Sequence, residues 1–249
     1  MFIGDWLARR AQLTPHKVAL IDTLHANRQI TYCEWNRSAN RTANYLRGQF
    51  DIAQGDRVAV LAMNSVAYLD IWFALGKLGG VLQNLNWRLS ARELIQLVQD
   101  ASPKVLLYGG DFLPLIADLR AALPELQFVA LDEKENLADS AFETRASFGE
   151  APPPEIELRW SDPWVICYTG GTTGTPKGAL LTHQAITANA ANTVISWGLT
   201  ADDVTLLNSP LFHTGGLNVF TAPLVYVGGT SIVTREFELE QTFDLLTGG

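Results

Sequence analysis

Cysteine is scarce in this sequence, and histidine offers no pattern for coordinating a metal. Only Cys33 and Cys167 occur among 249 residues, and both fall in apolar, strand-like runs. Two cysteines are too few for a disulfide framework, so we expect buried free thiols in a reducing compartment. His16, His25 and His183 lack the spacing of metal ligands and are interpreted as structural or solvated residues.

Positive charge is also in short supply. Lysine and arginine number 18 against 26 aspartates and glutamates, which gives a net charge of −8. The few cations form no dense basic cluster. This balance argues against a nucleic-acid-binding surface.

Long apolar runs are missing as well. The most apolar region, Val58–Leu82, is interrupted by Asn64, Asp70 and Lys77. It therefore falls short of the roughly 18 consecutive apolar residues that a membrane span needs. Met1–Asp5 meets acidic charge at once, unlike an export signal. We predict a cytoplasmic protein with no transmembrane segment.

What the sequence does have is a loop of unusual composition at residues 168–178. Tyr168 is followed there by four glycines, four threonines, one proline and one lysine. Glycine permits positive φ and close backbone approach, and successive N–H groups form concave anion-binding nests. Lys177 adds a full positive charge. This combination predicts a cradle for a polyphosphate.

The loop differs from the common nucleoside-triphosphatase loop, in which Gly-Lys-Ser/Thr runs directly into a helix. Pro176 precedes Lys177, and Gly178 follows it. Because proline disfavours a helical conformation at the residue before it, the loop cannot continue as a helix at its lysine. A flexible linker is the alternative, but a strand-like run before the loop and a helical run from Thr182 favour an ordered site.

Strand-like and helix-like segments alternate along the chain, which predicts an α/β fold with parallel sheets flanked by helices. A capping box at residues 90–93 supports one helix start. The expected strands cover residues 55–62, 81–85, 104–108, 128–131, 164–168, 204–207 and 230–233. The expected helices cover residues 65–78, 90–101, 114–123, 182–197, 216–225 and 239–246.

The connection over residues 133–155 is the best candidate for a subdomain boundary, because it mixes charges, small residues and a run of prolines. We expect a first α/β subdomain over 1–155, and the phosphate loop with the start of a second over 156–249. Ligands of parallel sheets bind beyond the carboxyl ends of the strands. The loop leaves a strand at that edge.

The loop, with Leu181-Thr-His183 shortly after it, resembles the adenylate-forming (AMP-binding) superfamily. Supporting segments follow in order along the chain: 55–60, 63–68, 75–80, 84–93 and 209–216. The chain looks most like the N-terminal half of an acyl-CoA synthetase of the fatty-acid type. The resemblance implies stacked parallel-sheet subdomains, flanked by helices and incomplete here.

A two-step reaction is also implied by the resemblance. A carboxylate attacks the α-phosphorus of ATP to give an acyl-adenylate and pyrophosphate, and the thiolate of coenzyme A then displaces AMP. The implied ligands are ATP, Mg²⁺, coenzyme A and a small-molecule carboxylic acid; a homodimer is possible. An anion must approach negative phosphoryl oxygens in the first step, so positive charge and N–H dipoles must be held ready there.

The resemblance assigns nucleotide binding to the loop and catalysis to Lys177. Thr169 and Thr172 are the expected Mg²⁺ contacts; hydrogen bonding within the loop is their alternative role. The full set of expected loop contacts is Thr169, Gly170, Gly171, Thr172, Thr173, Gly174, Thr175 and Lys177. The family usually has serine or threonine where this chain has Gly170, which removes one hydroxyl from the cradle.

His213 is the second expected catalytic residue and, with Gly215 and Gly216, the expected acid-binding site. Adenylation domains of peptide synthetases typically place an aspartate in this neighbourhood to hold an amino group. An imidazole here favours an acid without an amino group. The alternative is a loop histidine bonded to nearby backbone.

Members of the superfamily are much longer than this chain. Their adenine-binding segment, hinge and small C-terminal domain are absent from the sequence, so we expect an inactive N-terminal fragment. Two other interpretations stay open: a non-catalytic nucleotide- or acyl-binding module, and an amino-acid adenylation domain.

Overall fold

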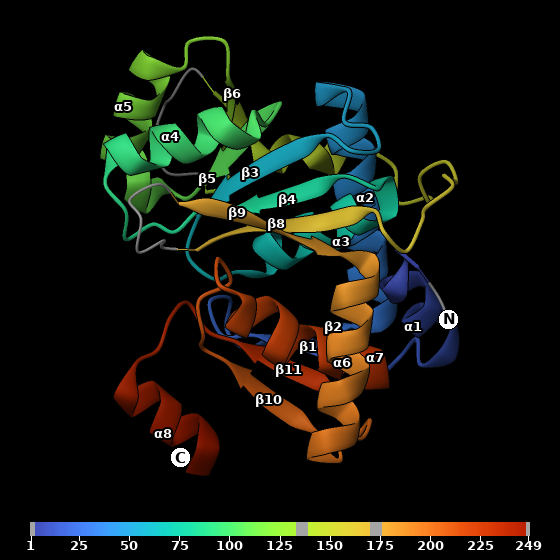
Figure 1. The fold of residues 1–249 in the computed structure, drawn as a ribbon. Helices are drawn as coiled ribbons and strands as arrows, with labels where there is room; N and C mark the ends of the chain where they lie inside the picture. The colour runs from blue at the N-terminus through green and yellow to red at the C-terminus, as the bar shows by residue number, and fades with distance from the viewer. Residues whose placement is uncertain (1–2, 133–138, 170–175, 248–249) are drawn as a thin grey trace.

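Two β-sheets with helices packed on them form the protein, which is described by a computed structural model over residues 3–132, 139–169 and 176–247 (Figure 1). One sheet has seven strands and the other four. The strands are β1 (Val18–Asp22), β2 (Arg28–Thr31), β3 (Arg57–Leu61), β4 (Val81–Asn84), β5 (Val105–Tyr108), β6 (Gln127–Ala130), β7 (Ser140–Ala141), β8 (Pro163–Thr169), β9 (Lys177–Thr182), β10 (Val204–Leu207) and β11 (Thr230–Val233). The helices are α1 (Trp6–Leu13), α2 (Tyr32–Phe50), α3 (Val66–Leu78), α4 (Ala91–Ala101), α5 (Leu113–Ala122), α6 (His183–Trp197), α7 (Ala222–Val227) and α8 (Leu239–Thr247). Three further helices of other types are η1 (Gly110–Phe112), η2 (Phe142–Ser147) and the π-helix η3 (Gly215–Thr221).

The seven-stranded sheet has the order β7-β6-β5-β3-β4-β8-β9 and is parallel except for the β8–β9 pair. Alternate residues of β3 enter different cores: Val58 and Val60 pack with residues of α2 and α3. Ala59 and Leu61 pack with residues of α4 and α5. Because successive side chains of a strand point to opposite faces, helices cover this sheet on both sides. The predicted α/β fold class is confirmed.

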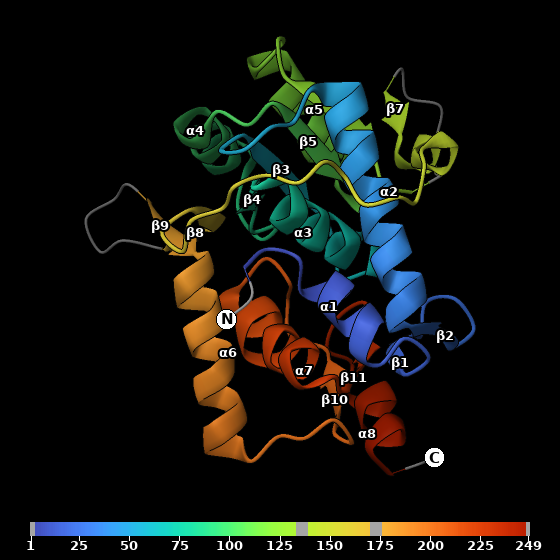
Figure 2. The same cartoon turned by 90° about the vertical axis from the view of Figure 1, so that its right-hand side faces the viewer.

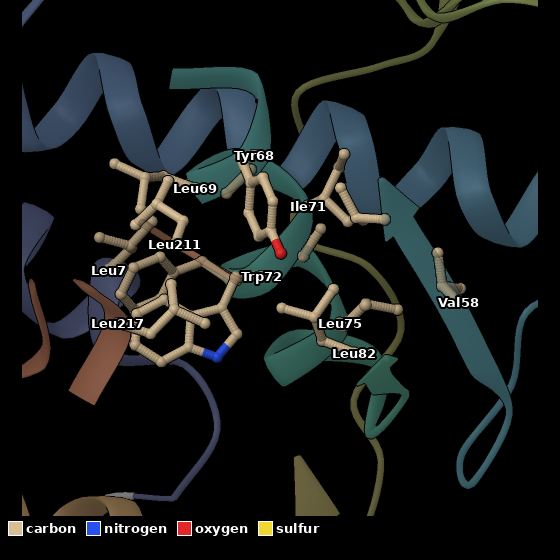
Figure 3. Close-up of a cluster of buried hydrophobic side chains, with 14 of the residues drawn as sticks. Leu7, Val58, Tyr68, Leu69, Ile71, Trp72, Leu75, Leu82, Leu211 and Leu217 are labelled. Carbon is tan, nitrogen blue, oxygen red and sulfur yellow. The ribbon is translucent and has the colours of Figure 1, made fainter. Parts of the chain in front are cut away.

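The larger core lies where α3 meets α1 and the second sheet. Figure 3 shows Leu7, Leu211 and Leu217 beside Trp72, although these residues come from distant parts of the chain. Trp72 stacks on Trp164, with ring centroids 4.9 Å apart and an interplanar angle of 24°. Burying such large aromatic side chains stabilises a core by both area and ring geometry.

The four-stranded sheet has the order β10-β11-β1-β2, so an N-terminal hairpin pairs with strands from the end of the chain. In the other direction, β8 pairs with β4 of the first half. Helix α2 packs along α3 and against strands β1 and β2 of the four-stranded sheet (Figure 2). Two strand pairs, β1–β11 and β4–β8, therefore join residues before and after residue 155, so each sheet contains strands from both parts of the chain. The division into subdomains 1–155 and 156–249 stays a prediction.

Helix ends follow the local sequence closely. Ser90 and Glu93 form the predicted capping box at the start of α4, and Thr31 with Glu34 forms another at α2. Such caps satisfy N–H groups that have no partner inside the helix. Gly79 ends α3 at φ +65°, a left-handed conformation that glycine adopts without strain.

Two expectations of secondary structure were wrong, and strand β9 was missed. The segment expected as one helix over 216–225 is the π-helix η3 followed by α7. Residues 177–182 form strand β9, which was not predicted, and it runs antiparallel to β8. Cys33 lies in α2 and is half-buried, not in a strand, because the capping box at Thr31 starts a helix there.

Among the residues that the structure describes, no helix combines the length and the apolar composition required to cross a bilayer.

Candidate functional site

The candidate phosphate loop joins the ends of two antiparallel strands. Thr169, the last residue of β8, pairs with Lys177, the first residue of β9, and its hydroxyl donates to the Lys177 carbonyl at 3.5 Å. Both residues are exposed. The prediction that the chain does not enter a helix at Lys177 is confirmed. The other expected loop contacts, Gly170, Gly171, Thr172, Thr173, Gly174 and Thr175, lie outside the described residues.

A buried polar chain supports the strand that enters the loop. The Tyr68 hydroxyl donates to Asn84 Oδ1 at 2.8 Å, and Asn84 Nδ2 lies 3.7 Å from Cys167 Sγ. Burial raises the pKa of Tyr68 well above its ordinary value and also raises the pKa of the Cys167 thiol. Both groups are therefore neutral at physiological pH, and Tyr68 keeps the proton that it donates.

Tyr168 anchors the same strand to α4. Its hydroxyl donates to Asp100 Oδ2 at 2.6 Å and lies 3.2 Å from the Leu97 carbonyl oxygen. Burial, followed by the bond to Asp100, raises the pKa of Tyr168. The loop thus starts from a strand fixed on two sides, which is the support that a preorganised site requires.

His213 lies in a turn that follows β10, and its backbone and ring are both held locally. The His213 N–H donates to the Pro210 carbonyl at 3.1 Å, and the Gly215 N–H donates to His213 Nδ1 at 3.2 Å. Because Nδ1 accepts a hydrogen bond, a neutral imidazole carries its proton on Nε2. The side chain is exposed, so its Nε2–H can donate to a ligand oxygen.

Gly216 is packed too tightly for any other residue. A Cβ added there would lie 2.6 Å from the Pro210 carbonyl oxygen. Gly215 is less confined, since its Cβ would lie 3.4 Å from His213 Nδ1. The close packing at Gly216 fixes where the π-helix starts relative to the turn; π-helical turns occur frequently at functional sites.

The turn meets the seven-stranded sheet at the end of β4. Phe212 packs edge-on against Trp87, with ring centroids 5.7 Å apart. Asn84 of β4 pairs with Cys167 of β8, so Trp87 and Thr169 both follow directly at the same sheet edge. The structure therefore brings the His213 turn and the start of the phosphate loop to one edge, by way of β4.

Trp87 and Arg88 lie beside this turn, and the sequence analysis did not single them out as candidate site residues. The Arg88 guanidinium lies 4.7 Å from the Trp87 ring centroid and 5.6 Å from that of Phe212. Cation–π contacts hold an exposed guanidinium in place without neutralising its charge. Both residues stand in the segment 84–93 that supported the family resemblance, and that was the signal that could have found them.

A separate cavity of about 930 Å³ opens where β3, β5 and β6 end. Its lining includes Asn64, Asp70, Arg145 and Arg235, with ion pairs such as Arg145–Asp70 at 2.8 Å inside it. His213 and Lys177 are not among its lining residues. Within residues 3–132, 139–169 and 176–247, no group of three or more His, Cys, Asp or Glu side chains is arranged to hold a metal ion.

Helix-covered parallel sheets, with the start of a Gly/Thr-rich segment at the carboxyl end of β8, place this chain among the α/β proteins, whose ligands bind at that edge of the sheet. The chain belongs to the AMP-binding enzyme family, whose profile matches residues 7–247. The resemblance inferred from the loop is thereby confirmed.

Relatives of this chain include coenzyme A ligases. It is 36% identical to indoleacetate–CoA ligase of Aromatoleum aromaticum over 246 residues, covering 99% of this chain and 48% of that protein. It is 34% identical over 251 residues to long-chain-fatty-acid–CoA ligase FadD13 of Mycobacterium tuberculosis, covering 98% and 47%. A crystal structure of the anthranilate CoA ligase AuaEII in complex with anthranoyl-AMP superposes with a TM-score of 0.88 at 26% identity, covering 95% and 45%. The chain spans about half the length of the curated relatives it matches.

Proposed function

We propose that this chain carries the phosphate-binding and acid-binding parts of an AMP-forming acid–thiol ligase. The protein would activate a carboxylic acid with ATP, release pyrophosphate, and pass the acyl group from AMP to the sulfur of coenzyme A. The observation that carries the proposal is the meeting of the loop start and the His213 turn at one edge of the sheet. A fatty acid is the acid that we expect, and the acids named for the relatives include aromatic ones.

Lys177 has the simplest role in this proposal. It stands at the exit of the loop on an exposed strand end. A cation there balances the charge on the β- and γ-phosphates and on the departing pyrophosphate. Such preorganised charge lowers the barrier only where phosphate charge sits or develops, so position matters more than the number of cations.

His213 would serve the acid side of the reaction. The Gly215 N–H occupies Nδ1, so Nε2–H points a single donor away from the turn. That donor can hold a carboxylate oxygen or a phosphoryl oxygen while the carboxylate attacks phosphorus. Aligning the two anions is the main task. Reactants that are bound in the correct orientation have already lost translational and rotational entropy, and this lowers the activation barrier of the chemical step.

Mg²⁺ belongs to the proposal as the partner of the nucleotide. Magnesium prefers oxygen ligands and usually binds through a few protein oxygens together with substrate phosphates. The Thr169 hydroxyl at the loop start is one such protein oxygen. When bound, Mg²⁺ would neutralise phosphate charge. Coenzyme A would be the second substrate; a homodimer and a cytoplasmic location stay predictions.

The experiment that tests the proposal is acid-dependent exchange of labelled pyrophosphate into ATP, run with the full-length gene product that contains this chain. A panel of saturated fatty acids, indoleacetate, anthranilate and amino acids identifies the acid. We expect exchange with an acid that lacks an amino group. Exchange with amino acids alone would favour an adenylation domain, and ATP binding without any exchange would favour a non-catalytic module.

A lysine variant sharpens this test. Lys177→Ala should lower the exchange rate roughly 100-fold, the usual effect of removing one preorganised charged or donor group. Lys17→Ala is the matched control, because among the described residues the Lys17 ammonium makes one ion pair, a 3.7 Å contact with the exposed Asp202. An unchanged rate in the Lys177 variant would contradict the phosphate role. The purified 249-residue chain is expected to form no acyl-CoA by itself.

A further inference from the structure

The side chain of Asn64 connects the two sheets at the site. Asn64 follows β3 of the seven-stranded sheet and is only 4% exposed. Its Oδ1 accepts the Leu211 N–H at 2.8 Å, and its Nδ2 donates to the Ser209 carbonyl at 3.0 Å. Both contacts are to the turn that carries His213, which belongs to the four-stranded sheet.

The backbone of Asn64 makes a further contact with the four-stranded sheet. Its N–H donates to the Arg235 carbonyl at 3.2 Å, just beyond β11. The Arg235 guanidinium pairs with Asp111, which follows β5. The end of β3 thus bonds to the segments after both β10 and β11.

An amide is the side chain that fits this position. It offers one donor and one acceptor at a fixed separation, and here both are used by a carbonyl and an N–H two residues apart. A buried donor or acceptor that loses its partner costs free energy. Moving the turn away from Asn64 would leave such groups unpaired, so the turn is held firmly in place. Leu211 is buried from the other side, next to Leu7 and Trp72 (Figure 3).

We propose that Asn64 is a positioning residue, which fixes the turn Ser209–His213 against the sheet that carries the start of the phosphate loop. The effect of Asn64 on the reaction rests on the proposed function. The effect of Asn64 on the position of the turn does not. His213 lies two residues beyond the bonded Leu211 N–H, so a shift of the turn moves the imidazole relative to Thr169 and Lys177. Loss of Asn64 should therefore impair use of the acid more than binding of ATP.

Hydrogen–deuterium exchange of the 249-residue chain tests the effect on the turn. In Asn64→Ala, amides of residues 209–216 should exchange roughly tenfold faster or more, because two buried hydrogen bonds are lost. Asn64→Asp keeps the acceptor for the Leu211 N–H but places a carboxylate oxygen against the Ser209 carbonyl oxygen at a buried position, so its increase should be no smaller than that of Asn64→Ala. Asp111→Asn is the control: it removes an exposed ion pair between the same sheets and should leave residues 209–216 unchanged.

Kinetics of the full-length gene product test the effect on the reaction. Asn64→Ala should raise the KM for the acid roughly tenfold and leave the KM for ATP within about twofold. A merely structural role would lower kcat through a smaller active fraction and leave both KM values unchanged. That pattern, or unchanged protection of residues 209–216 in Asn64→Ala, would overturn the proposal. If the native full-length protein shows no acid-dependent pyrophosphate exchange, the proposed function fails. The hydrogen–deuterium exchange of residues 209–216 still decides whether Asn64 positions the turn.

Discussion

Protonation of a single buried histidine should destabilise this protein in mild acid. His183 is the first residue of α6 and is 1% exposed. Its ring stacks on Trp164, with centroids 4.9 Å apart and an interplanar angle of 17°. Among the described residues, neither ring nitrogen has a hydrogen-bond partner. Burial lowers the pKa of His183 from 6.5 to about 4, with a smaller opposing effect from Asp162.

The direction of the pH dependence of stability follows from the lowered pKa of His183. The unfolded chain takes up a proton on His183 near pH 6.5, and the folded chain resists it until about pH 4. Stability is therefore complete above pH 6.5 and is lost as the pH falls toward 4. A difference of 2.5 pKa units corresponds to about 3 kcal/mol in full, of which about 1.3 kcal/mol is lost between roughly pH 7.5 and 5.5. The positive end of α6 acts in the same direction.

The measurement is denaturant unfolding across this pH range for the native chain and His183→Phe. Phenylalanine keeps a planar ring on Trp164 and cannot take a proton, so the variant should lose less stability on acidification, by about 1.3 kcal/mol at pH near 5.5. His16→Gln, at an exposed position, is the control and should follow the native curve. Other groups titrate in the same range, so the difference between the curves is the readout. Parallel curves for the native chain and His183→Phe would refute the reasoning.

Three further changes should act through packing and capping. Gly76→Ala should destabilise the fold by about 1–2 kcal/mol in denaturant unfolding: the new methyl would lie 2.7 Å from the fixed Trp164 ring, and overpacking strain exceeds the gain in helix propensity. Ser90→Ala should cost about 1 kcal/mol in the same assay through loss of the capping box of α4; an unchanged midpoint would show that the cap contributes nothing. Gly216→Ala should raise the KM for the acid in pyrophosphate exchange, because its Cβ would lie 2.6 Å from a backbone carbonyl oxygen of the turn. Gly149→Ala, whose Cβ would contact nothing within 4 Å, should change neither stability nor kinetics.

Much of the seven-stranded sheet could be predicted because its signals are local. The apolar run that forms strand β5 and the capping box that starts α4 at Ser90 each occupy a few consecutive residues, and the structure confirms both. The start of α2 was equally accessible: Thr31 and Glu34 have capping-box spacing, and that signal was not used. Local chemistry of this kind depends little on what surrounds it.

Strand β9 was missed for a physical reason. Its first four residues, from Lys177, are all exposed, so no alternation of buried and exposed positions marks it as a strand. It forms because β8 offers an unpaired edge after the loop turns the chain back. Likewise, nothing in residues 215–221 separates a π-helix from an α-helix, since the wider turn is set by the packing of Gly216 against the preceding turn.

The same distinction between local and long-range signals applies to the candidate site. Each of its parts was visible in the sequence as a short motif, but the contacts that join them were not. Asn64 and Leu211 are separated by 147 residues, and no rule of spacing connects them. The carboxyl edge of a parallel sheet supplies the common location, because β3, β4 and β8 all end there. Sequence motifs can therefore indicate candidate residues for binding phosphate and acid. The alignment of the two depends on a long-range amide contact, which is why the Asn64 variants test the mechanism more directly than any change within the motifs themselves.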